Sequence, residues 1–273
     1  MSQEFRVLPV EGMPEVREGD RVGALIAERT QLEPSDVVVI SQKIVSKAEG
    51  RVTRLDSVTP SERAHELAEG LGKEPGFVEL VLSESREVLR EERVLITETH
   101  HGFVCANAGI DSSNLPEDDT VCLLPKDPDA SARQIRKELA TVPEGAGVSL
   151  SRHSTASHRR AVSGEGHPSP LPAVVIADSF GRAWRLGQVE VAIGCAGLQP
   201  LDDWRGRSDA SGRELSATVI AIADEVAAAA DLVRQKDSQV PVVVVRGLGR
   251  YVGAEDGPGA AALRRPPGED LFR

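Results

Sequence analysis

DVVVISQ, at residues 36–42, is a run of β-branched residues set between polar ends. Such a run predicts a short strand buried on both faces, as in a sheet that helices cover on both sides. PAVVIAD at residues 172–178 and VPVVVVRGL at residues 240–248 have the same character and predict two more strands. The first strand ends in Ser41-Gln42-Lys43 and the second ends on Asp178, so polar groups gather where open α/β sheets tend to bind ligands.

Helices are expected between these strands. Thr59-Pro60-Ser61-Glu62 predicts a helix start, with Thr59 as the N-cap and Pro60 at the first helical position, and the helix continues over residues 63–71. A second helix is expected from about Phe77 to Glu92. A third follows Asp129, which we expect to be its cap, and a long alanine-rich helix is expected over about Ser216–Gln235.

Three more strands complete the expected elements: RVLITET at residues 93–99, GFVCANAG at residues 102–109 and VEVAIGCAGL at residues 189–198. The elements do not follow one clean βαβ rhythm. The chain also lacks a P-loop and a complete GxGxxG motif. We therefore predict a mixed α/β (α+β) fold that is neither Rossmann-like nor a P-loop fold.

Two segments differ from the rest in composition. Residues 143–172 include SRHSTASHRRAVSGEGHPSPLP, which is nearly free of large apolar residues and predicts a disordered insertion. Residues 254–273 are rich in Gly, Pro and Ala and predict a loose C-terminal tail. The expected organisation is therefore one functional domain over residues 1–253 followed by that tail.

The composition excludes several classes of function. Aromatic residues make up 3% of the chain and the net charge is −11. These values argue against stacking platforms for single-stranded nucleic acid and against a basic nucleic-acid-binding face. The N-terminus lacks a signal peptide, and no apolar run reaches the roughly 20 residues of a membrane span. We expect a cytoplasmic protein with no nucleic-acid or membrane partner.

The three cysteines, Cys105, Cys122 and Cys195, have no CxxC spacing. They fit neither a disulfide framework nor a structural zinc site, and we expect them to be small core residues. The six histidines show no HxxxH or HExxH spacing, and no GxSxG motif occurs. A zinc enzyme and a serine hydrolase are therefore not expected.

Two polar clusters lie in the first half of the chain. Ser41-Gln42-Lys43 with Ser46-Lys47 offers hydroxyl and ammonium groups that could hold phosphates, although surface lysines would explain the same residues. Asn107–Asn114 contains Asp111 in a tight polar turn. A carboxylate there suits a hard cation such as Mg²⁺, and an Asx-turn that only reverses the chain is the alternative.

Two more polar clusters lie in the second half of the chain. Asp178-Ser179, followed by Arg182, could form a metal and phosphate corner, and Asp178 placed near Asp111 would hold a cation between them. Alternatively Asp178 caps the next element. Residues 202–214 combine arginines with carboxylates and could recognise an acidic substrate bidentately, or could be a solvated loop.

Six strings occur along the chain in this order: ISQKIVSKAEGR (40–51), HGFVCANAGIDSSN (101–114), LLPKDPDASA (123–132), IADSFGRAWRLGQVEVAIGCAGL (176–198), DWRGRSDASGREL (203–215) and ADEVAAAADLV (223–233). Together they resemble the coenzyme F420-0:γ-glutamyl ligase family, over roughly residues 6–253. The resemblance is specific, because an NAGIDxSN segment is followed by DSFGRxWRxG.

The resemblance implies a two-lobed ligase fold in an intertwined homodimer. It also implies a reaction that joins L-glutamate, through amide bonds, to the lactyl-phosphate side chain of the deazaflavin coenzyme F420-0. GTP phosphorylates the terminal carboxylate of the coenzyme, and the glutamate amine then attacks the acyl phosphate. One or two divalent cations, Mg²⁺ or Mn²⁺, and potassium are the implied ions. This chemistry needs positioning and charge neutralisation more than a protein nucleophile.

The same resemblance assigns residues to roles. Lys47, Asp111 and Asp178 are implied to be catalytic, with Asp111 and Asp178 as ligands of one metal and Ser179 and Gln235 as ligands of a second. The implied nucleotide contacts are Met13, Pro14, Glu15, Val16, Ser41, Gln42, Lys47, Asn114, Leu232, Val233, Arg234 and Gln235.

The chain departs from the family pattern after the long helix. The family has Met-Gly followed by Glu or Gln, whereas this chain has Val233-Arg234-Gln235-Lys236 and is one residue shorter. This puts the second metal in doubt. Two alternatives to the ligase remain open: a metal-dependent nucleotide phosphohydrolase, which would not need coenzyme or glutamate, and a non-catalytic module that binds the deazaflavin.

Overall fold

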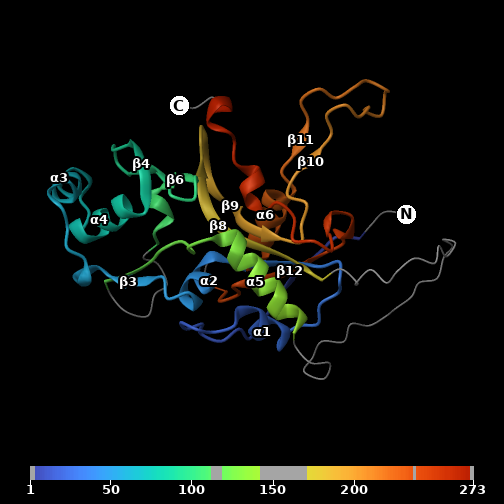
Figure 1. The fold of residues 1–273 in the computed structure, drawn as a ribbon, viewed down its shortest axis with the longest axis horizontal. Helices are drawn as coiled ribbons and strands as arrows, with labels where there is room; N and C mark the ends of the chain where they lie inside the picture. The colour runs from blue at the N-terminus through green and yellow to red at the C-terminus, as the bar shows by residue number, and fades with distance from the viewer. Residues whose placement is uncertain (1–3, 112–118, 142–170, 236–237, 271–273) are drawn as a thin grey trace.

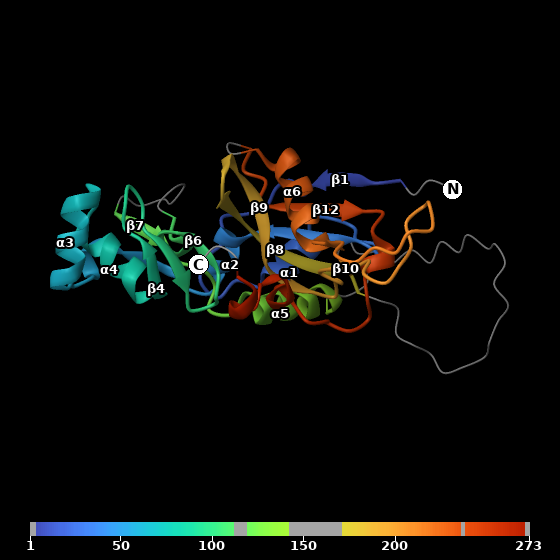
Figure 2. The same cartoon turned by 90° about the horizontal axis from the view of Figure 1, so that it is seen from above.

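The computed structural model describes residues 4–111, 119–141, 171–235 and 238–270. These residues form two lobes (Figures 1 and 2). The larger lobe is built around a five-stranded sheet, and the smaller lobe holds the helices and short strands between residues 52 and 122. The mixture of helices and sheets confirms the predicted α+β class.

The central sheet contains the three strands that the β-branched runs predict. Its strand order is β1-β12-β2-β8-β9. Within the described residues of this sheet, β2 and β8 pair in parallel and the other neighbours pair antiparallel, which differs from an all-parallel Rossmann sheet. Its strands are β1 (Arg6–Pro9), β2 (Val37–Ser41), β8 (Ala173–Arg182), β9 (Arg185–Ala196) and β12 (Val242–Arg246).

Helices cover both faces of this sheet, as the continuous apolar strands require (Figure 2). Alternate residues of β2 point to opposite sides, so Val38 and Ile40 join one core cluster while Val37 and Val39 join the other. The first core is closed by α1 (Val22–Ala27) and α5 (Pro128–Ala140), and the second by α6 (Ile222–Arg234).

A glycine permits the close packing of α5 on the sheet. A Cβ atom at Gly194 of β9 would lie 2.3 Å from the carbonyl oxygen of Pro128, the first residue of α5. Any side chain at this position would therefore push the helix away from β9. The helix in turn fixes the strand that carries part of the polar site described below.

The smaller lobe has its own hydrophobic core, formed by α3, α4 and the segments around β5 and β7. One three-stranded sheet, β4-β5-β6, and one two-stranded sheet, β3-β7, belong to it, while α2 leads from the central sheet towards it. The elements are α2 (Gln42–Ala48), β3 (Val52–Arg54), α3 (Glu62–Leu71), α4 (Pro75–Ser83), β4 (Ser85–Arg90), β5 (Ile96–Thr99), β6 (Val104–Ala106) and β7 (Thr120–Cys122).

Several predicted helix ends are wrong by a few residues. Ser61, not Thr59, caps α3: its Oγ accepts a hydrogen bond from the Ala64 amide at 3.2 Å. Asp127, not Asp129, caps α5, accepting from Ala130 N at 2.9 Å. In both cases the side-chain oxygen of the true cap accepts a hydrogen bond from the amide three residues further along the chain.

Two predicted helices are shorter because strand pairing replaces helix. The helix expected over Phe77–Glu92 ends at Ser83, and the residues that follow form β4, which pairs antiparallel with β5. The helix expected from Ser216 begins at Ile222, because β11 (Val219–Ile220) pairs with β10 (Asp202–Asp203). Tertiary pairing has overridden the local preference in both segments.

Residues 254–270 contact the body of the protein, which differs from the loose tail that their composition predicts. Asp256 accepts a hydrogen bond from the buried guanidinium of Arg136 at 2.9 Å, and the Asp129 carboxylate accepts from the amides of Ala260 and Ala261 at 2.7 and 3.1 Å. The predicted insertion at residues 143–172 falls almost entirely outside the described residues.

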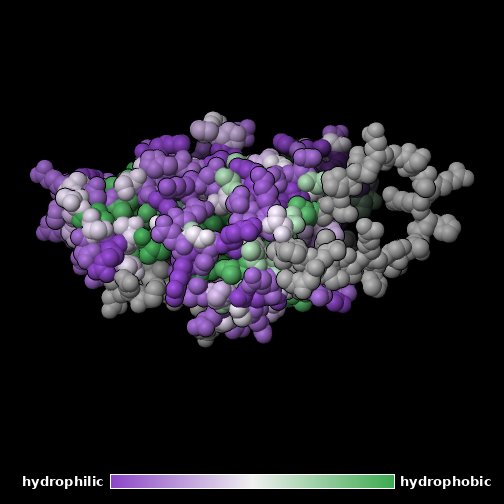
Figure 3. Space-filling view, turned by 60° about the horizontal axis from the view of Figure 1, so that its bottom comes forward, coloured by the Kyte–Doolittle hydropathy of each residue, from purple (hydrophilic) through white to green (hydrophobic). Residues whose placement is uncertain are grey.

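The three cysteines are buried and unpaired, which confirms their prediction as core residues. Among the described residues, none of the helices combines the length and the apolar character that crossing a lipid bilayer requires. The face in Figure 3 is mostly polar, with small scattered hydrophobic patches.

Candidate active site

The candidate site forms where β2 ends and α2 begins. Parallel pairing places Ser41, the last residue of β2, beside Ala177 of β8. The first turn of α2 therefore lies next to Asp178 and Ser179, the next two residues of β8. Two polar clusters that are far apart in the sequence thus meet at the end of the sheet, as their position after buried strands predicts.

Lys43 links this end of the sheet to the smaller lobe. Its ammonium nitrogen lies 2.8 Å from Oδ2 of Asp111, and both side chains are partly exposed. Asp111 is held in place by backbone hydrogen bonds in both directions with Cys122. The Asp111 carboxylate is therefore fixed at the junction of the lobes, facing α2.

Asp178 lies within the electrostatic range of several charged groups. The pKa of the Asp178 carboxyl is raised to about 7, first by burial and then by the negative charges of Glu190 and Asp111, while the Ser179 amide and Lys43 oppose the shift. The Asp111 charge therefore acts on the Asp178 carboxyl, and the binding of one cation by both carboxylates, which the resemblance implies, stays a prediction. Burial and the Asp178 charge also raise the pKa of the Cys105 thiol to about 12, so this thiol stays protonated and is not a nucleophile.

Glu190 is a site residue that the sequence analysis does not identify. It lies directly across from Ser179 in the β8–β9 pair. Its Oε1 accepts a hydrogen bond from Ser179 Oγ at 2.7 Å, and its Oε2 accepts one from Nη1 of Arg234 at 3.1 Å. Only the register of the hairpin reveals this role, because nothing in the sequence ties residue 190 to residue 179.

Lys47 lies one helical turn after Lys43 on α2, so both ammonium groups leave the same side of the helix. Lys47 donates a hydrogen bond to Oε1 of Glu15 at 2.6 Å. The structure thus brings the N-terminal turn Met13–Val16 to the lysine with which it is predicted to share a nucleotide. Glu15 and Pro14 are exposed, whereas Met13 and Val16 pack into the first core.

The other predicted contacts differ in how available their side chains are. Gln42 is buried, and its amide nitrogen donates to Ser46 Oγ at 2.6 Å and to the Leu123 carbonyl at 3.0 Å, so its side chain points into the protein. Ser41 is partly exposed at the strand end. Asn114 lies outside the described residues.

The end of α6 reaches the same region through Arg234. Arg234 is buried and bound to Glu190, whereas Leu232 is exposed and Val233 is half-buried. Gln235, the C-cap residue, has a φ angle of +49° and is exposed. The ion pair of Arg234 with Glu190 fixes the helix end that precedes Gln235 to β9.

A cation would suit the charges at this site. Asp178 has a raised pKa because it is buried and because the charges of Glu190 and Asp111 act on it, and a cation bound at Asp178 would offset both effects. In the described part of the chain, no three His, Cys, Asp or Glu side chains gather into a metal cage. Two carboxylates still fit Mg²⁺, which is usually bound by one or two of them together with water and substrate phosphates.

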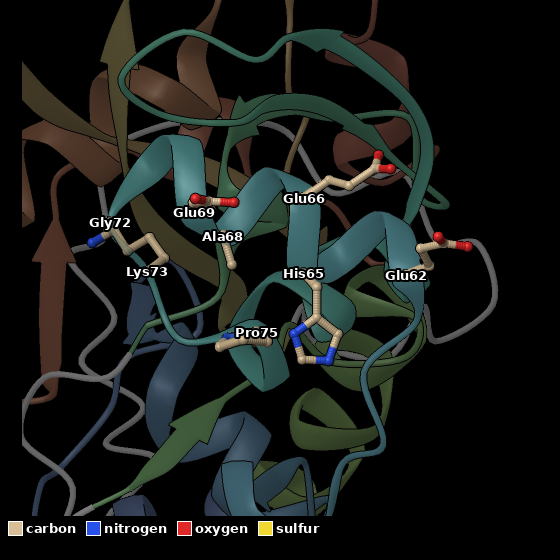
Figure 4. A pocket seen from close by; sticks show the side chains of 8 residues that line it. All are labelled: Glu62, His65, Glu66, Ala68, Glu69, Gly72, Lys73 and Pro75. Atoms are coloured by element: carbon tan, nitrogen blue, oxygen red, sulfur yellow. The ribbon is translucent and has the colours of Figure 1, made fainter.

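A separate hollow lies on the smaller lobe, away from these residues. The side chains of α3 and the start of α4 line it, with Glu62, Glu66 and Glu69 on the helix and His65 beside them (Figure 4). It is open and acidic, and none of its lining residues belongs to the constellation around Asp178. The polar end of the central sheet is therefore the stronger candidate for the active site.

Comparisons with known proteins all identify the same family of ligases. The family model described as F420-0:Gamma-glutamyl ligase matches residues 12–149 and 170–247. The chain is 42% identical to the coenzyme F420:L-glutamate ligase of Methanothermobacter thermautotrophicus, and the alignment covers 98% of both chains. It is 41% identical to the enzyme of the same name from Methanopyrus kandleri, over 98% of both, and 38% identical to that of Methanocaldococcus jannaschii, over the full length of both.

Proposed function

Because this chain belongs to the F420-0:γ-glutamyl ligase family, we propose that it attaches L-glutamate to coenzyme F420-0 with the use of GTP and a divalent cation. The observation that carries the proposal is the 2.8 Å ion pair between Lys43 and Asp111, which places an ammonium group and a carboxylate within electrostatic range of Asp178 at the end of the central sheet. Carboxylates for a cation and ammonium groups for phosphates are what a phosphoryl-transfer site needs.

The proposed reaction has two steps. A carboxylate oxygen of F420-0 attacks the γ-phosphorus of GTP, and GDP leaves with the electron pair of the broken bond. The amine of L-glutamate then attacks the acyl phosphate and loses a proton, and inorganic phosphate leaves as the amide forms. The described residues supply charge and orientation for both steps, and neither step needs a protein nucleophile.

Asp111 and Asp178 are the proposed ligands of a divalent cation, with Ser179 beside them. Such an ion, when bound, neutralises the phosphate charge and orients the oxygens of the transferring group. The relief of repulsion around Asp178 supports this assignment. Ser179 and Gln235 are the proposed ligands of a second divalent cation, and potassium is a further proposed ion.

Lys47 and Lys43 are the proposed phosphate-binding cations. Each is paired with a carboxylate that a nucleotide could displace or share: Glu15 for Lys47 and Asp111 for Lys43. Met13–Val16 and Ser41 surround this point and are proposed to contact the nucleotide. Gln42 would contribute through its backbone, since its side chain is engaged inside the protein.

The proposed functional unit is a homodimer. The β8–β9 hairpin supports this idea, because two large apolar side chains at its tip, Trp184 and Leu186, are 85% and 98% exposed. Exposed apolar side chains on a projecting arm are typical of contacts between subunits.

The decisive experiment is mass spectrometry of F420-0 after incubation with the full chain, L-glutamate, GTP and Mg²⁺ or Mn²⁺. We expect a mass increase of one or more glutamyl units that requires both GTP and the cation. Asp111→Asn should lower turnover by at least about 100-fold and leave the fold intact, since it removes a charge at the site and no core volume.

The possible outcomes separate the alternatives. GTP cleavage without modified coenzyme would favour a nucleotide phosphohydrolase. Tight coenzyme binding without GTP turnover would favour a binding module. Near-normal ligase activity of Asp111→Asn would contradict the assigned site, even if the ligase activity itself is established.

A further inference from the structure

Glu190 joins two parts of the site through one side chain. Its two carboxylate oxygens have different partners: Oε1 accepts from the Ser179 hydroxyl at 2.7 Å and Oε2 accepts from the Arg234 guanidinium at 3.1 Å. Glu190 is 5% exposed and Arg234 is 8% exposed. A buried carboxylate that is used at both oxygens is held rigidly, and it holds its partners in turn.

The hydrogen bond to Ser179 fixes the direction in which that hydroxyl presents its oxygen. A serine hydroxyl has one hydrogen, and here the hydrogen is committed to Glu190. The oxygen lone pairs are therefore what the side chain can offer to a cation. A neighbouring residue that accepts a hydrogen bond from a metal ligand orients that ligand and increases the affinity of the site for the metal.

Arg234 provides the counter-charge for Glu190. Without it, Glu190 would be a buried carboxylate with no counter-charge, next to Asp178, on which its negative charge already acts. Nε and Nη2 of Arg234 are buried and have no hydrogen-bond partner among the described residues, so Glu190 is the partner that the structure shows for this guanidinium. The ion pair also ties the last turn of α6, which precedes Gln235, to β9.

We propose that Glu190 is a positioning residue of the active site. It orients the Ser179 hydroxyl towards the cation that Ser179 is proposed to bind, and Arg234 holds Glu190 in the position from which it does so. This inference rests on the metal-dependent function proposed above. Glu190 acts through Ser179 and does not contact the substrate.

The test measures cation binding directly, on the full chain without substrates. Free Mn²⁺ is followed by electron paramagnetic resonance during titration of the wild type, Glu190→Gln, Ser179→Ala and the double variant. We expect each single variant to weaken Mn²⁺ binding by about 10–100-fold. The double variant should bind within about twofold of Ser179→Ala, because residues that act through one another are not additive.

A matched control comes from the opposite end of β2. Asp36 is a buried carboxylate that accepts two hydrogen bonds from Arg246, at 2.8 and 2.9 Å, away from the site. Asp36→Asn breaks a comparable buried ion pair and should leave Mn²⁺ affinity unchanged, with thermal unfolding as the measure of its structural cost. In kinetics, Glu190→Gln should raise the Mn²⁺ concentration for half-maximal ligase activity and keep kcat at saturating Mn²⁺ within about threefold of the wild type.

The outcomes distinguish the two proposals. If the wild type does not bind Mn²⁺, the metal-dependent function is wrong, and the role of Glu190 falls with it. If the wild type binds but Glu190→Gln binds equally well, only the positioning role is wrong. The positioning role would also be wrong if the losses in Mn²⁺ affinity of the two single variants added up in the double variant, because Glu190 would then not act through Ser179. It would likewise be wrong if Asp36→Asn lost as much Mn²⁺ affinity as Glu190→Gln, because the effect would then come from a general loss of stability.

Discussion

The charge on Asp178 should destabilise the cation-free protein at high pH. Its pKa is raised from 3.8 to about 7 in the native state, so the native state binds the proton more tightly than the unfolded chain. The free energy of unfolding should therefore fall as pH rises from about 4 to about 7. Asp178→Asn removes this charge and should be more stable than the wild type at pH 8, by roughly 1–3 kcal/mol.

Urea unfolding in the presence of a chelator, at pH 8 and at pH 4, would test this expectation. The advantage of Asp178→Asn should largely disappear at pH 4, where the wild-type carboxyl is protonated in the native state. Ligase activity should be lost at every pH, because the proposed cation ligand is gone. A variant that is less stable than the wild type at both pH values would show that the carboxylate has a structural role instead.

At the scale of single residues, the sequence indicated part of the candidate site. Asp178 and Lys43 were visible as polar residues that follow buried strands. The ion pair of Lys43 with Asp111 was not visible, because it depends on how the two lobes meet. Glu190 was not predictable, because its partners are set by the register of the β8–β9 hairpin and by the end of a distant helix.

At the scale of elements, the strands of the sheet were predictable and the helix ends were less so. A run such as DVVVISQ leaves few alternatives to a buried strand. Helix ends depend on competition between caps that lie two residues apart, and α4 ends where β4 can pair with β5. Asp129, expected to be a cap, instead accepts hydrogen bonds from the amides of Cys195, Ala260 and Ala261.

Asp129 should therefore be more important for stability than a helix cap. Asp129→Ala leaves three amides of β9 and of residues 260–261 without their acceptor. We expect a loss of about 2–4 kcal/mol in the free energy of unfolding. Asp127→Ala removes the actual cap of α5 and is the matched control, with an expected loss of about 1 kcal/mol. Chemical denaturation of both variants measures the two losses in free energy of unfolding. An equal or larger loss in Asp127→Ala would contradict the greater importance of Asp129.

At the scale of the whole molecule, the sequence indicated an α+β protein and, through its resemblance, two lobes. The structure confirms the class and shows the lobes meeting at the polar end of the central sheet (Figure 1). The sequence did not indicate which surface a second copy of the chain would contact. An apolar residue in a predicted strand can face either a hydrophobic core or a partner subunit, and the sequence does not distinguish the two. The exposure of Trp184 and Leu186 becomes visible only once β8 and β9 are seen to extend beyond the sheet.

The hairpin tip should be needed for dimerisation. Replacing both Trp184 and Leu186 by Ser removes the large apolar side chains that the arm exposes, and tryptophan is among the residues that most often dominate the binding energy of an interface. We expect the dissociation constant of the dimer to rise by at least about tenfold, measured by analytical ultracentrifugation. Gln188→Ser, an exposed polar change on the same arm, should leave the constant unchanged. If the double variant dimerises normally, the interface lies elsewhere; if the wild type is monomeric at micromolar concentration, the proposed homodimer is wrong.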